Sequence, residues 1–418
     1  MSNFLKGSAI YFIANICSAA TPFLLLPIFT RYLSQEQFGQ IAIFQMLYTG
    51  LAAFIGVNSV GAASRRYYDA DHNKLAEFNG QCFVILLFSI ITILFVAIFF
   101  SLKLSQELNI PEYWVYAAIV VAITNFIILF RLGQWQIRSK AKQYGYLQVG
   151  NSFIGFIFTL LLLFTILPDG HSRVIALVSI GALVSSFCFI SLRRDNLLKF
   201  SGINIQVIKD ILNFGGPLIP HVFGMFIISS FDRVVINDNL GLDQVGIYAL
   251  ASQLSMGLLV VFDAINKAYV PWLFEKLKKN DHRDKIKIVK NTYLYFVLLI
   301  TISGLGFLFG EFVVVLVGGE VYREAGKVFG WLFMGQVFIG MYLMVTNYIF
   351  YSKKTGSLAL VTISSGVLNV FLLYILVPEY GLLGAAYAFV ISMFIRFLVT
   401  WVVSIHVYSM PWLGRLRD

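Results

Sequence analysis

Ionisable side chains inside long apolar runs are the residues of this chain whose chemistry stands out. Arg396 is the clearest case: in the run of residues 381–407 it has 15 uncharged residues before it and 11 after it. A charge within a bilayer is costly, so such a residue is expected either to face a hydrated cavity, where it could bind an anion, or to meet a partner inside a helix bundle. The sequence leaves both readings open.

Asp263 and Lys267 form a second ionisable pair, near the end of the apolar run that starts at Val245. On a helix they would share one face, four residues apart, with the acid N-terminal, which is the favourable order for an ion pair. Asn266 lies beside them. The three residues either line a cavity or, if the helix ends near Phe262, lie at the membrane surface.

A third candidate group combines Pro217, Pro220 and His221 in one apolar run. Proline removes a backbone donor and kinks a helix, and kinks at membrane depth tend to line cavities. His221 could donate hydrogen bonds or carry a proton near neutral pH. A lone histidine is more often a packing residue, so its role also stays open. The first run contains a comparable pair, Pro22 and Pro27.

These residues are positioned by twelve uncharged stretches of about 15 to 25 residues, and a run of about 18 apolar residues is long enough to cross a bilayer. Hydrophobic residues make up 59% of the chain and charged residues 12%, against roughly 25% charged in soluble proteins. The sequence therefore predicts an all-α polytopic membrane protein with 12 transmembrane helices. The stretches begin at Ser8, Gly39, Gln81, Tyr113, Leu147, Val174, Ile211, Val245, Thr292, Val328, Thr355 and Gly381.

Basic residues alternate between the connecting loops. The two termini and the even-numbered loops hold 24 Lys and Arg residues, the odd-numbered loops hold 6, and Arg396 completes the 31. By the positive-inside rule both termini are expected to be cytoplasmic. The net charge of +10 then reflects cytoplasmic loops, so anionic membrane lipids are the expected partner and nucleic acid is not.

Motifs for other chemistries are absent from the sequence. Neither a nucleotide-binding loop GxxxxGK[ST], nor HExxH, nor the dinucleotide-binding glycine pattern occurs. Cys17, Cys82 and Cys188 lie inside apolar runs and have no metal-ligand spacing. The longest connection, residues 263–291, is too short for a catalytic domain. We therefore expect no catalytic residue, no cofactor and no metal site.

The two halves of the chain resemble each other at an offset of about 210 residues. Residues 162–169 (LLFTILPD) align without a gap on residues 372–379 (LLYILVPE), and Gln37-Phe38-Gly39 matches Gln244-Val245-Gly246. Six helices separate the matched segments, so the halves have the same orientation and form parallel repeats. The expected organisation is two six-helix lobes, 1–195 and 211–418, joined by a cytoplasmic linker, 196–210, around a central cavity.

Arginines near the ends of the runs are further candidates. Arg31 and Arg233 stand near the outward ends of the first and seventh runs, where they could bind an anionic ligand, although Asp232 could equally neutralise Arg233. The planar guanidinium suits a diphosphate because it can bind two oxygens at once. A separate group lies at cytoplasmic ends, where it could guide a phosphate inward or simply fix topology: Arg65, Arg66 and Arg131.

Several segments resemble one family of membrane proteins. Residues 22–33 (PFLLLPIFTRYL) followed by Phe38-Gly39 resemble the first helix and turn of the Wzx-type O-antigen flippases, as do residues 231–233 (FDR) followed by 245–249 (VGIYA). Residues 380–388 (YGLLGAAYA) resemble the glycine-alanine start of their last helices. These flippases belong to the polysaccharide transporter family of the multidrug/oligosaccharidyl-lipid/polysaccharide superfamily. The resemblance covers the whole chain.

The resemblance implies a function. Family members move undecaprenyl-diphosphate-linked oligosaccharide units from the cytoplasmic to the periplasmic leaflet of the bacterial inner membrane by alternating access. Basic cavity residues would hold the diphosphate, and of the candidates only Arg31 and Arg233 are carried over from the family pattern. A polysaccharide polymerase and a chain-length regulator are the implied protein partners.

Three alternatives remain open. MurJ-type lipid II flippases are similar but usually have fourteen spans in a longer chain. MATE-type drug exporters share the fold and use acids within helices for cation coupling, a role for which this chain offers Asp263 and Asp232. A membrane enzyme such as a polymerase is disfavoured by the short outward loops. His221 and Asp263 are also the residues through which transport could be linked to protons.

Overall fold

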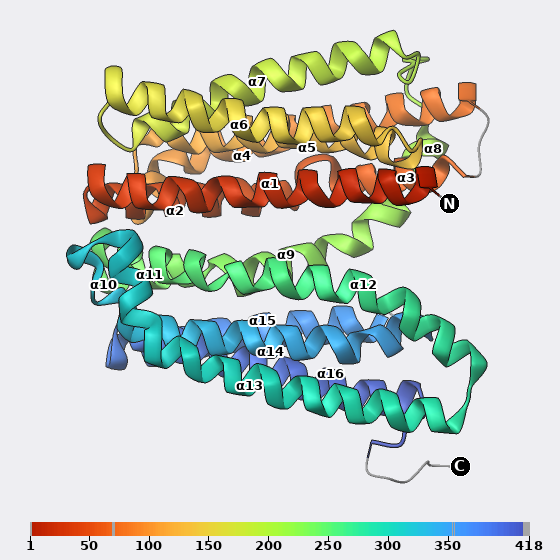
Figure 1. Cartoon of the computed structure of the whole chain (residues 1–418). Helices are drawn as coiled ribbons and strands as arrows, with labels where there is room; N and C mark the ends of the chain where they lie inside the picture. The colour runs from red at the N-terminus through yellow and green to blue at the C-terminus, as the bar shows by residue number, and fades with distance from the viewer. Residues whose placement is uncertain (1, 69–71, 353, 355, 413–418) are drawn as a thin grey trace. The chain divides into compact units, whose positions relative to one another are not determined.

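The computed structural model describes residues 2–68, 72–352, 354 and 356–412, and in these ranges the regular structure is all helical, with no strand (Figure 1). Among the described residues, eleven helices are long and apolar enough to cross a membrane, and the number is twelve when the bent pair of Gln35–Ala52 and Ile55–Arg66 is counted as one span. Six spans precede residue 195 and six follow residue 204. The predicted all-α membrane class, with six helices in each half, is confirmed.

Packing divides the chain into two compact units, residues 1–226 and 227–418. The division falls inside a helix and lies beyond the linker expected at 196–210, so the expected lobe limits stay a prediction. The helices of the first unit are α1 (Ser2–Tyr32), α2 (Gln35–Ala52), η1 (Ile55–Asn58), α3 (Ser59–Arg66), α4 (His72–Leu108), α5 (Glu112–Ile137), α6 (Ala141–Thr165), α7 (His171–Arg194), α8 (Ile205–Gly215), η2 (Gly216–Leu218) and the start of α9 (Ile219–Ser230).

In the first unit α6 lies between α1 and α7, and α5 packs against α7, α2 and α4. Figure 1 shows α1, α5 and α6 running nearly parallel along most of their length. An aromatic cluster holds α4, α5 and α7 together, with the Phe83 ring 5.2 Å from Phe130 and 5.5 Å from Phe189. The apolar faces of these helices are therefore used against each other, which leaves the space between α1, α5, α6 and α7 for polar side chains.

The second apolar run is broken where the sequence predicts one continuous span. Gly56, Val57 and Asn58 have φ angles of 67°, 49° and 52°, and α2 meets the η1–α3 segment at a bend of 53°. A β-branched residue such as Val57 rarely adopts this left-handed conformation. Two contacts compensate: Ser89 Oγ accepts a hydrogen bond from the Gly56 N–H at 3.0 Å, and the Phe126 ring fills the space where a side chain on Gly56 would stand.

The segment expected to link the two lobes, residues 196–210, is hydrogen-bonded to α4. Asn79 donates to the Leu197 carbonyl at 2.9 Å, and Gln81 donates to the Gly202 carbonyl at 2.7 Å and accepts from the Asn204 N–H at 3.1 Å. The Asn204 side chain in turn caps α8, which packs against α3 and α4. These contacts attach the segment to the first unit.

The second unit is built around α14, which packs against α11, α12, α13 and α16, while α15 packs against α16. After α16 the chain folds back, and Trp412 is buried among Tyr293, Tyr348 and Trp401. The helices of this unit are α10 (Asp232–Leu240), α11 (Leu242–Ser255), α12 (Gly257–Lys279), α13 (His282–Gly318), η3 (Glu320–Tyr322), α14 (Ala325–Tyr351), α15 (Gly356–Tyr380) and α16 (Leu382–Val407).

Candidate functional site

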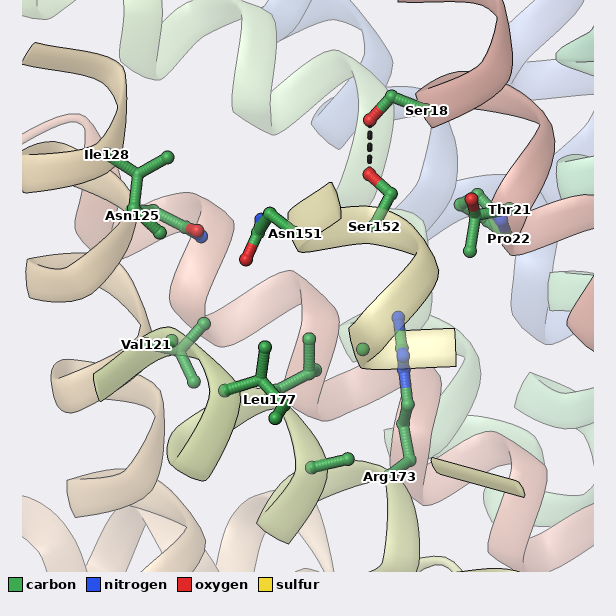
Figure 2. Close-up of a pocket in the computed structure, with 14 residues that line it drawn as sticks. Ser18, Thr21, Pro22, Val121, Asn125, Ile128, Asn151, Ser152, Arg173 and Leu177 are labelled. Atoms are coloured by element: carbon green, nitrogen blue, oxygen red, sulfur yellow. Dashed lines mark hydrogen bonds between the residues drawn. The ribbon is translucent and has the colours of Figure 1, made fainter. Parts of the chain in front are cut away.

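A small polar cavity of about 140 Å³ lies inside the first unit, between α1, α5, α6 and α7. Figure 2 shows its lining side chains converging from these four helices. An apolar bundle gains nothing from hydroxyl and amide groups in its interior unless they are hydrogen-bonded or meet a polar ligand. The polar lining consists of Ser18, Thr21, Asn125, Asn151, Ser152 and Arg173.

Arg173 is the cation of this cavity. The start of α7 positions it: Asp169 Oδ1 accepts the His171 N–H at 2.9 Å, and Ser172 Oγ donates to the Asp169 carbonyl at 2.8 Å. This turn places Arg173 in the first turn of α7, and Figure 2 shows its side chain extending from α7 toward Ser152. A short polar turn therefore directs a charged side chain into the bundle.

Arg173 is buried, with 9% of the residue exposed, yet its guanidinium has few partners. Nη1 donates to Thr159 Oγ1 at 3.2 Å, whereas Nε has no hydrogen-bond partner among the described residues. Within that part of the chain, Arg173 forms no salt bridge with an acidic side chain. A buried cation without a counter-charge is unfavourable, so the geometry suits an anion supplied by a ligand.

The amides of the cavity are also available to a ligand. The side chains of Asn125 and Asn151 form no hydrogen bond with the described residues, and each can offer two donors and an acceptor. Pro22 lines the same wall and has no N–H to give to the Ser18 carbonyl one turn earlier. Together these groups can bind hydroxyls as well as an anion.

Polar contacts between α1 and α6 form the wall on one side of the cavity. Ser18 and Ser152 share a short hydrogen bond between their hydroxyls, drawn in Figure 2. Gln148 donates to Ser18 Oγ at 3.2 Å, and Tyr144 donates to Asn15 Oδ1 at 3.2 Å. The two helices are thus joined by exchangeable hydrogen bonds along the face that lines the interior.

A second cavity, of about 560 Å³, adjoins the first, and Asn125 lines both. It lies between α1, η1–α3, α5, α6 and the α8–η2 segment, and Phe126 and Phe214 supply apolar walls. The Asn58 Nδ2 group is buried there without a hydrogen-bond partner among the described residues. Its polar lining is rich in amides and contains no charged residue: Asn15, Asn58, Ser64, Asn125, Gln136, Tyr144 and Gln148.

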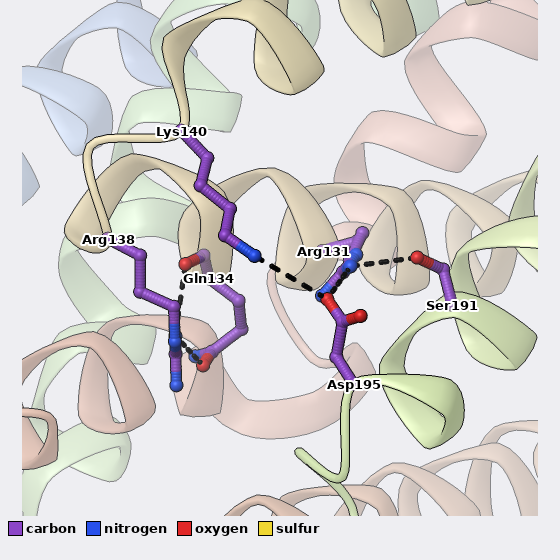
Figure 3. Close-up of polar contacts among 6 residues, drawn as sticks. All are labelled: Arg131, Gln134, Arg138, Lys140, Ser191 and Asp195. Carbon is purple, nitrogen blue, oxygen red and sulfur yellow. Dashed lines mark hydrogen bonds and ion pairs between the residues drawn. The ribbon is translucent and has the colours of Figure 1, made fainter.

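Arg131, one of the predicted entry residues, is buried instead in an ion pair (Figure 3). Its Nη2 atom lies 2.5 Å from Asp195 Oδ2 and 2.8 Å from Ser191 Oγ, and its guanidinium lies 4.2 Å from the centre of the Trp135 ring. Only 1% of the side chain is exposed. Arg131 thus ties α5 to the end of α7, the geometry of a structural residue.

The ion pair lowers the pKa of the Asp195 carboxyl. Partial burial alone would raise its pKa, but the hydrogen bond from Arg131 and the charges of Arg131, Lys140 and Arg138 outweigh burial and hold the pKa below its ordinary range. Lys140 Nζ lies 4.0 Å from Asp195 Oδ2, and Arg138 donates to Gln134 Oε1 at 2.7 Å (Figure 3). Asp195 is therefore ionised and neutralises part of this basic end.

Arg65 and Arg66 stand at the same end of the unit, on the last turn of α3. The Arg65 guanidinium lies 5.8 Å from the Phe214 ring centre, and that of Arg66 lies 5.7 Å from the Phe78 ring centre. Arg65 is exposed and Phe214 lines the larger cavity. Of the three predicted entry residues, Arg65 is the one placed beside a cavity and open to solvent.

Arg396 lies among α14, α15 and α16 in the second unit, with 3% of its surface exposed. Its guanidinium lies 4.2 Å from the Tyr342 ring centre, and Nη2 donates to Thr362 Oγ1 at 3.5 Å. Of the two readings that the sequence left open, this placement matches a residue packed inside the bundle.

Asp263, Lys267 and Asn266 lie on α12, which continues to Lys279, so the helix does not end near Phe262, as one of the two readings required. Lys267 Nζ lies 2.5 Å from Asp263 Oδ2, and both side chains are more than half exposed. Asn266 Oδ1 instead accepts a hydrogen bond from Asn347 Nδ2 of α14 at 2.8 Å. The ion pair and the amide thus have different environments.

Arg233 donates to the Asp232 carboxylate at 2.8 Å and to the Ser229 carbonyl at 2.8 Å. Asp232 is buried, which matches the reading in which the acid neutralises the arginine. Arg31 is exposed near the end of α1, in the other unit. His221 is half-buried on α9, just after the η2 turn that contains Pro217, and the kink expected at the prolines of this run stays a prediction.

The sequence did not identify Arg173 as a candidate. It immediately precedes the run that starts at Val174 and was counted among the residues of a short outward loop. The signal that could have identified it is the set of amides inside uncharged runs, Asn125 and Asn151, because amides in a bundle need partners. The spacing of these residues in the sequence does not predict that the Arg173 side chain points toward Asn125 and Asn151.

Comparison with known proteins shows that the chain is similar to polysaccharide biosynthesis proteins. A model of the family described as "Polysaccharide biosynthesis protein" matches residues 4–277. The capsular polysaccharide biosynthesis protein CapF of Staphylococcus aureus is 25% identical, with 94% of this chain and 97% of CapF covered. The probable low-salt glycan biosynthesis flippase Agl15 of Haloferax volcanii is 24% identical, with 97% and 83% covered.

Among solved structures, the fold is similar to an inward-facing multidrug resistance MATE family transporter of the MOP superfamily. The TM-score is 0.69 at 18% sequence identity, with 92% of this chain and 93% of the transporter covered. At this identity the likeness concerns the fold alone.

Proposed function

Because the chain belongs to the polysaccharide biosynthesis protein family, we propose that it is a flippase for lipid-linked oligosaccharides. Its substrate is an undecaprenyl-diphosphate-linked repeat unit of O-antigen or a related surface polysaccharide. The unit passes from the cytoplasmic to the periplasmic leaflet of a bacterial inner membrane by alternating access. Relatives named for capsular polysaccharide biosynthesis and for glycan flipping support this proposal.

The observation that carries the proposal is the pair of polar cavities within the first unit, whose linings share Asn125. Sugar hydroxyls lose their hydrogen bonds to water when they enter a bilayer, and the amides of a cavity can replace those bonds. A cavity lined by amides, hydroxyls and aromatic rings provides such an environment, and Arg173 adds affinity for an anion. No chemical bond is broken in such a process, so the role requires no catalytic residue.

A place for the lipid tail is available on the outer side of the same helix pair. An open groove of about 400 Å³ runs between α1 and α6 and is lined by Ile10, Ile13, Ala14, Gly145, Tyr146 and Val149, with Lys142 at its edge. Ile13 and Tyr146 are exposed, whereas Asn15 and Gln148 of the same helices line the interior. An isoprenoid chain in the groove and a glycan in the interior would thus be separated by the α1–α6 contacts.

A cation-coupled drug exporter is the second candidate, since the fold is similar to MATE transporters. Arg173 argues against it, because a buried positive charge without a counter-charge repels the cationic compounds that such exporters carry. A lipid II flippase shares the anionic lipid-linked substrate and differs in the glycan. Both alternatives are separated from the proposal by the substrate that accumulates when the protein is missing.

Deletion of the gene in its own host, with complementation by the full chain, tests the proposed function. We expect loss of surface polysaccharide and accumulation of single lipid-linked repeat units on the cytoplasmic side, whose composition identifies the sugar. Product consumption by a polymerase and a chain-length regulator on the outer side would then stop as well. Normal surface polysaccharide with changed sensitivity to cationic drugs would instead establish the exporter.

A further inference from the structure

The two cavities of the first unit differ in chemistry along one direction. On α6 the larger cavity is lined by Tyr144 and Gln148 and the smaller one by Asn151, Ser152 and Gly155, whereas on α5 the two linings overlap, from Ala122 to Gln136 for the larger cavity and from Val121 to Ile128 for the smaller. Together they span 15 residues of α5 from Val121 to Gln136, or about 22 Å at 1.5 Å per residue. The polar lining as a whole is therefore elongated, without charge toward Gln136 and with Arg173 toward its other end.

The two ends of this lining have different positions along the unit. The larger cavity lies near the end of α5 and the start of α6, beside the basic cluster of Arg131, Arg138 and Lys140, which the distribution of basic residues predicts to be cytoplasmic. Arg173 lies at the start of α7, at the opposite end. If a lipid-linked glycan enters from the cytoplasmic leaflet, its diphosphate stays near the basic end and its distant sugars reach Arg173.

We propose, resting on the proposed function, that Arg173 forms an anion subsite for the glycan itself, and that the chain selects repeat units with an acidic group on a sugar distant from the lipid. The chemical class is a carboxylate or a phosphate ester. Nε and the second Nη group of a guanidinium can bind two oxygens in parallel, and the Arg173 Nε group is the one without a partner. The neutral sugars bind in the larger, amide-lined cavity.

The smaller cavity supports this assignment by its size. A volume of about 140 Å³ accommodates an acidic group with part of its sugar ring, whereas the 560 Å³ cavity before it has room for the preceding sugars. Thr21, Asn125 and Asn151 surround the anion subsite with groups that bind ring hydroxyls. A neutral sugar in the same place would leave the buried guanidinium without a counter-charge, so selection follows from the cost of that charge.

Binding to the purified full chain in lipid nanodiscs tests the subsite without transport. The probes are sodium glucuronate, glucose and inorganic pyrophosphate at equal ionic strength. We expect glucuronate to bind at least tenfold more tightly than glucose, Arg173→Gln to abolish that preference, and Arg173→Lys to retain part of it. Lys103→Gln, which removes an exposed positive charge from α4, is the matched control and should change nothing.

The outcomes separate the two sources of anion. Equal weakening of glucuronate and pyrophosphate binding in Arg173→Gln would mean that Arg173 serves any phosphate, including the lipid diphosphate, and would overturn the assignment to the glycan. Absence of a glucuronate preference in the natural chain would overturn it as well. Neither result depends on flipping, so the gene-deletion experiment still decides the proposed function on its own.

A transport experiment completes the test in strains that lack their own flippase. One strain makes a repeat unit that contains a hexuronic acid and the other a neutral unit of equal length. We expect the natural chain to restore export of the acidic unit, and Arg173→Gln to lose that export while neutral export, where present, is unchanged. Equal loss of both would point to the shared diphosphate and contradict the proposal.

Discussion

Arg131 Nη2 lies 2.5 Å from Asp195 Oδ2, so the buried end of α5 is joined to the residue that follows α7. The guanidinium is almost fully buried, whereas the carboxylate is 35% exposed. The two partners therefore differ in how much each depends on the other: Asp195 retains water as an alternative, while Arg131 depends on Asp195 and on the Trp135 ring.

Replacement of Asp195 by Asn should destabilise the protein by roughly 1–3 kcal/mol, less than for a fully buried pair because the carboxylate is partly solvated. The physical reason is that the buried guanidinium loses its counter-charge. The midpoint of thermal unfolding, followed by tryptophan fluorescence in detergent, measures the effect. Glu107→Gln, which breaks the exposed Lys103–Glu107 pair, should leave the midpoint nearly unchanged. Equal effects of the two variants would contradict the structural role of Arg131.

The same pair predicts a pH dependence. The pKa of the Asp195 carboxyl is lower in the folded protein than its ordinary value of 3.8, so the folded state binds this proton less readily than the unfolded state. Its contribution to stability is then fully present above about pH 5 and is lost as the pH falls through the folded pKa. The difference in unfolding midpoint between the natural chain and Asp195→Asn should be constant at neutral pH and shrink below about pH 4. A difference that grows on acidification would reverse the assigned sign.

Gly215 and Gly216 are neighbours that differ in the space available for a side chain. A Cβ on Gly215 would lie 1.9 Å from the Val57 carbonyl oxygen, a backbone atom at the bend of the second run, whereas a Cβ on Gly216 meets nothing within 4 Å. Gly215→Ala should therefore lower the free energy of unfolding by about 1–3 kcal/mol, as is typical of overpacking. The unfolding midpoint or the yield of folded protein should fall accordingly. Gly216→Ala should be neutral. Similar behaviour of both variants would mean that α8 does not pack on the bend as described.

Asn266 and Asp263 on α12 provide a second matched comparison. Asn266→Ala leaves the buried Asn347 amide without its partner, which should cost about 1–3 kcal/mol. Asp263→Asn breaks an exposed ion pair and should cost less than about 1 kcal/mol. Unfolding midpoints of the two variants check the order. If Asp263→Asn is the more damaging change, the pair is buried in the membrane-embedded protein.

Arg396 and Tyr342 can be examined by a double-mutant cycle. Arg396→Gln and Tyr342→Ala should each destabilise the protein, and their effects should be non-additive by about 0.5–2 kcal/mol, because the guanidinium lies over the ring. We expect insertion into the membrane to be unaffected and transport to be impaired in proportion to the loss of stability. Complete loss of transport by Arg396→Gln at unchanged stability would show instead that Arg396 contacts the substrate.

The fold could be predicted from the sequence because it depends on the lengths of consecutive apolar runs. Apolar run length gives the spans, and each predicted run, from Ser8 to Gly381, corresponds to a helix or a pair of helices. The break at Gly56–Asn58 could not be read in this way. It depends on a left-handed conformation at Val57, which its own residue type disfavours and which contacts from Phe126, Ser89 and Gly215 make possible.

The candidate site was harder to predict for a related reason. The sequence drew attention to charges deep within runs, such as Arg396, and to charges at run ends, such as Arg131, and the structure gives both of these close protein partners. Arg173 also stands at a run end, but its direction depends on the Asp169 turn and on the rotation of α7 about its axis. Helix rotation is set by packing against several neighbours at once, and no local pattern encodes it.

The left-handed bend at residues 56–58 has a consequence for how the first unit can move. A proline kink opens and closes with small changes in several dihedral angles, whereas this bend can straighten only if three consecutive residues change the sign of φ. That change would also expel the Phe126 ring and break the Ser89 hydrogen bond. The angle between α2 and the η1–α3 segment is therefore fixed. Any widening of the larger cavity must come from its other walls, α1, α5, α6 and the α8–η2 segment.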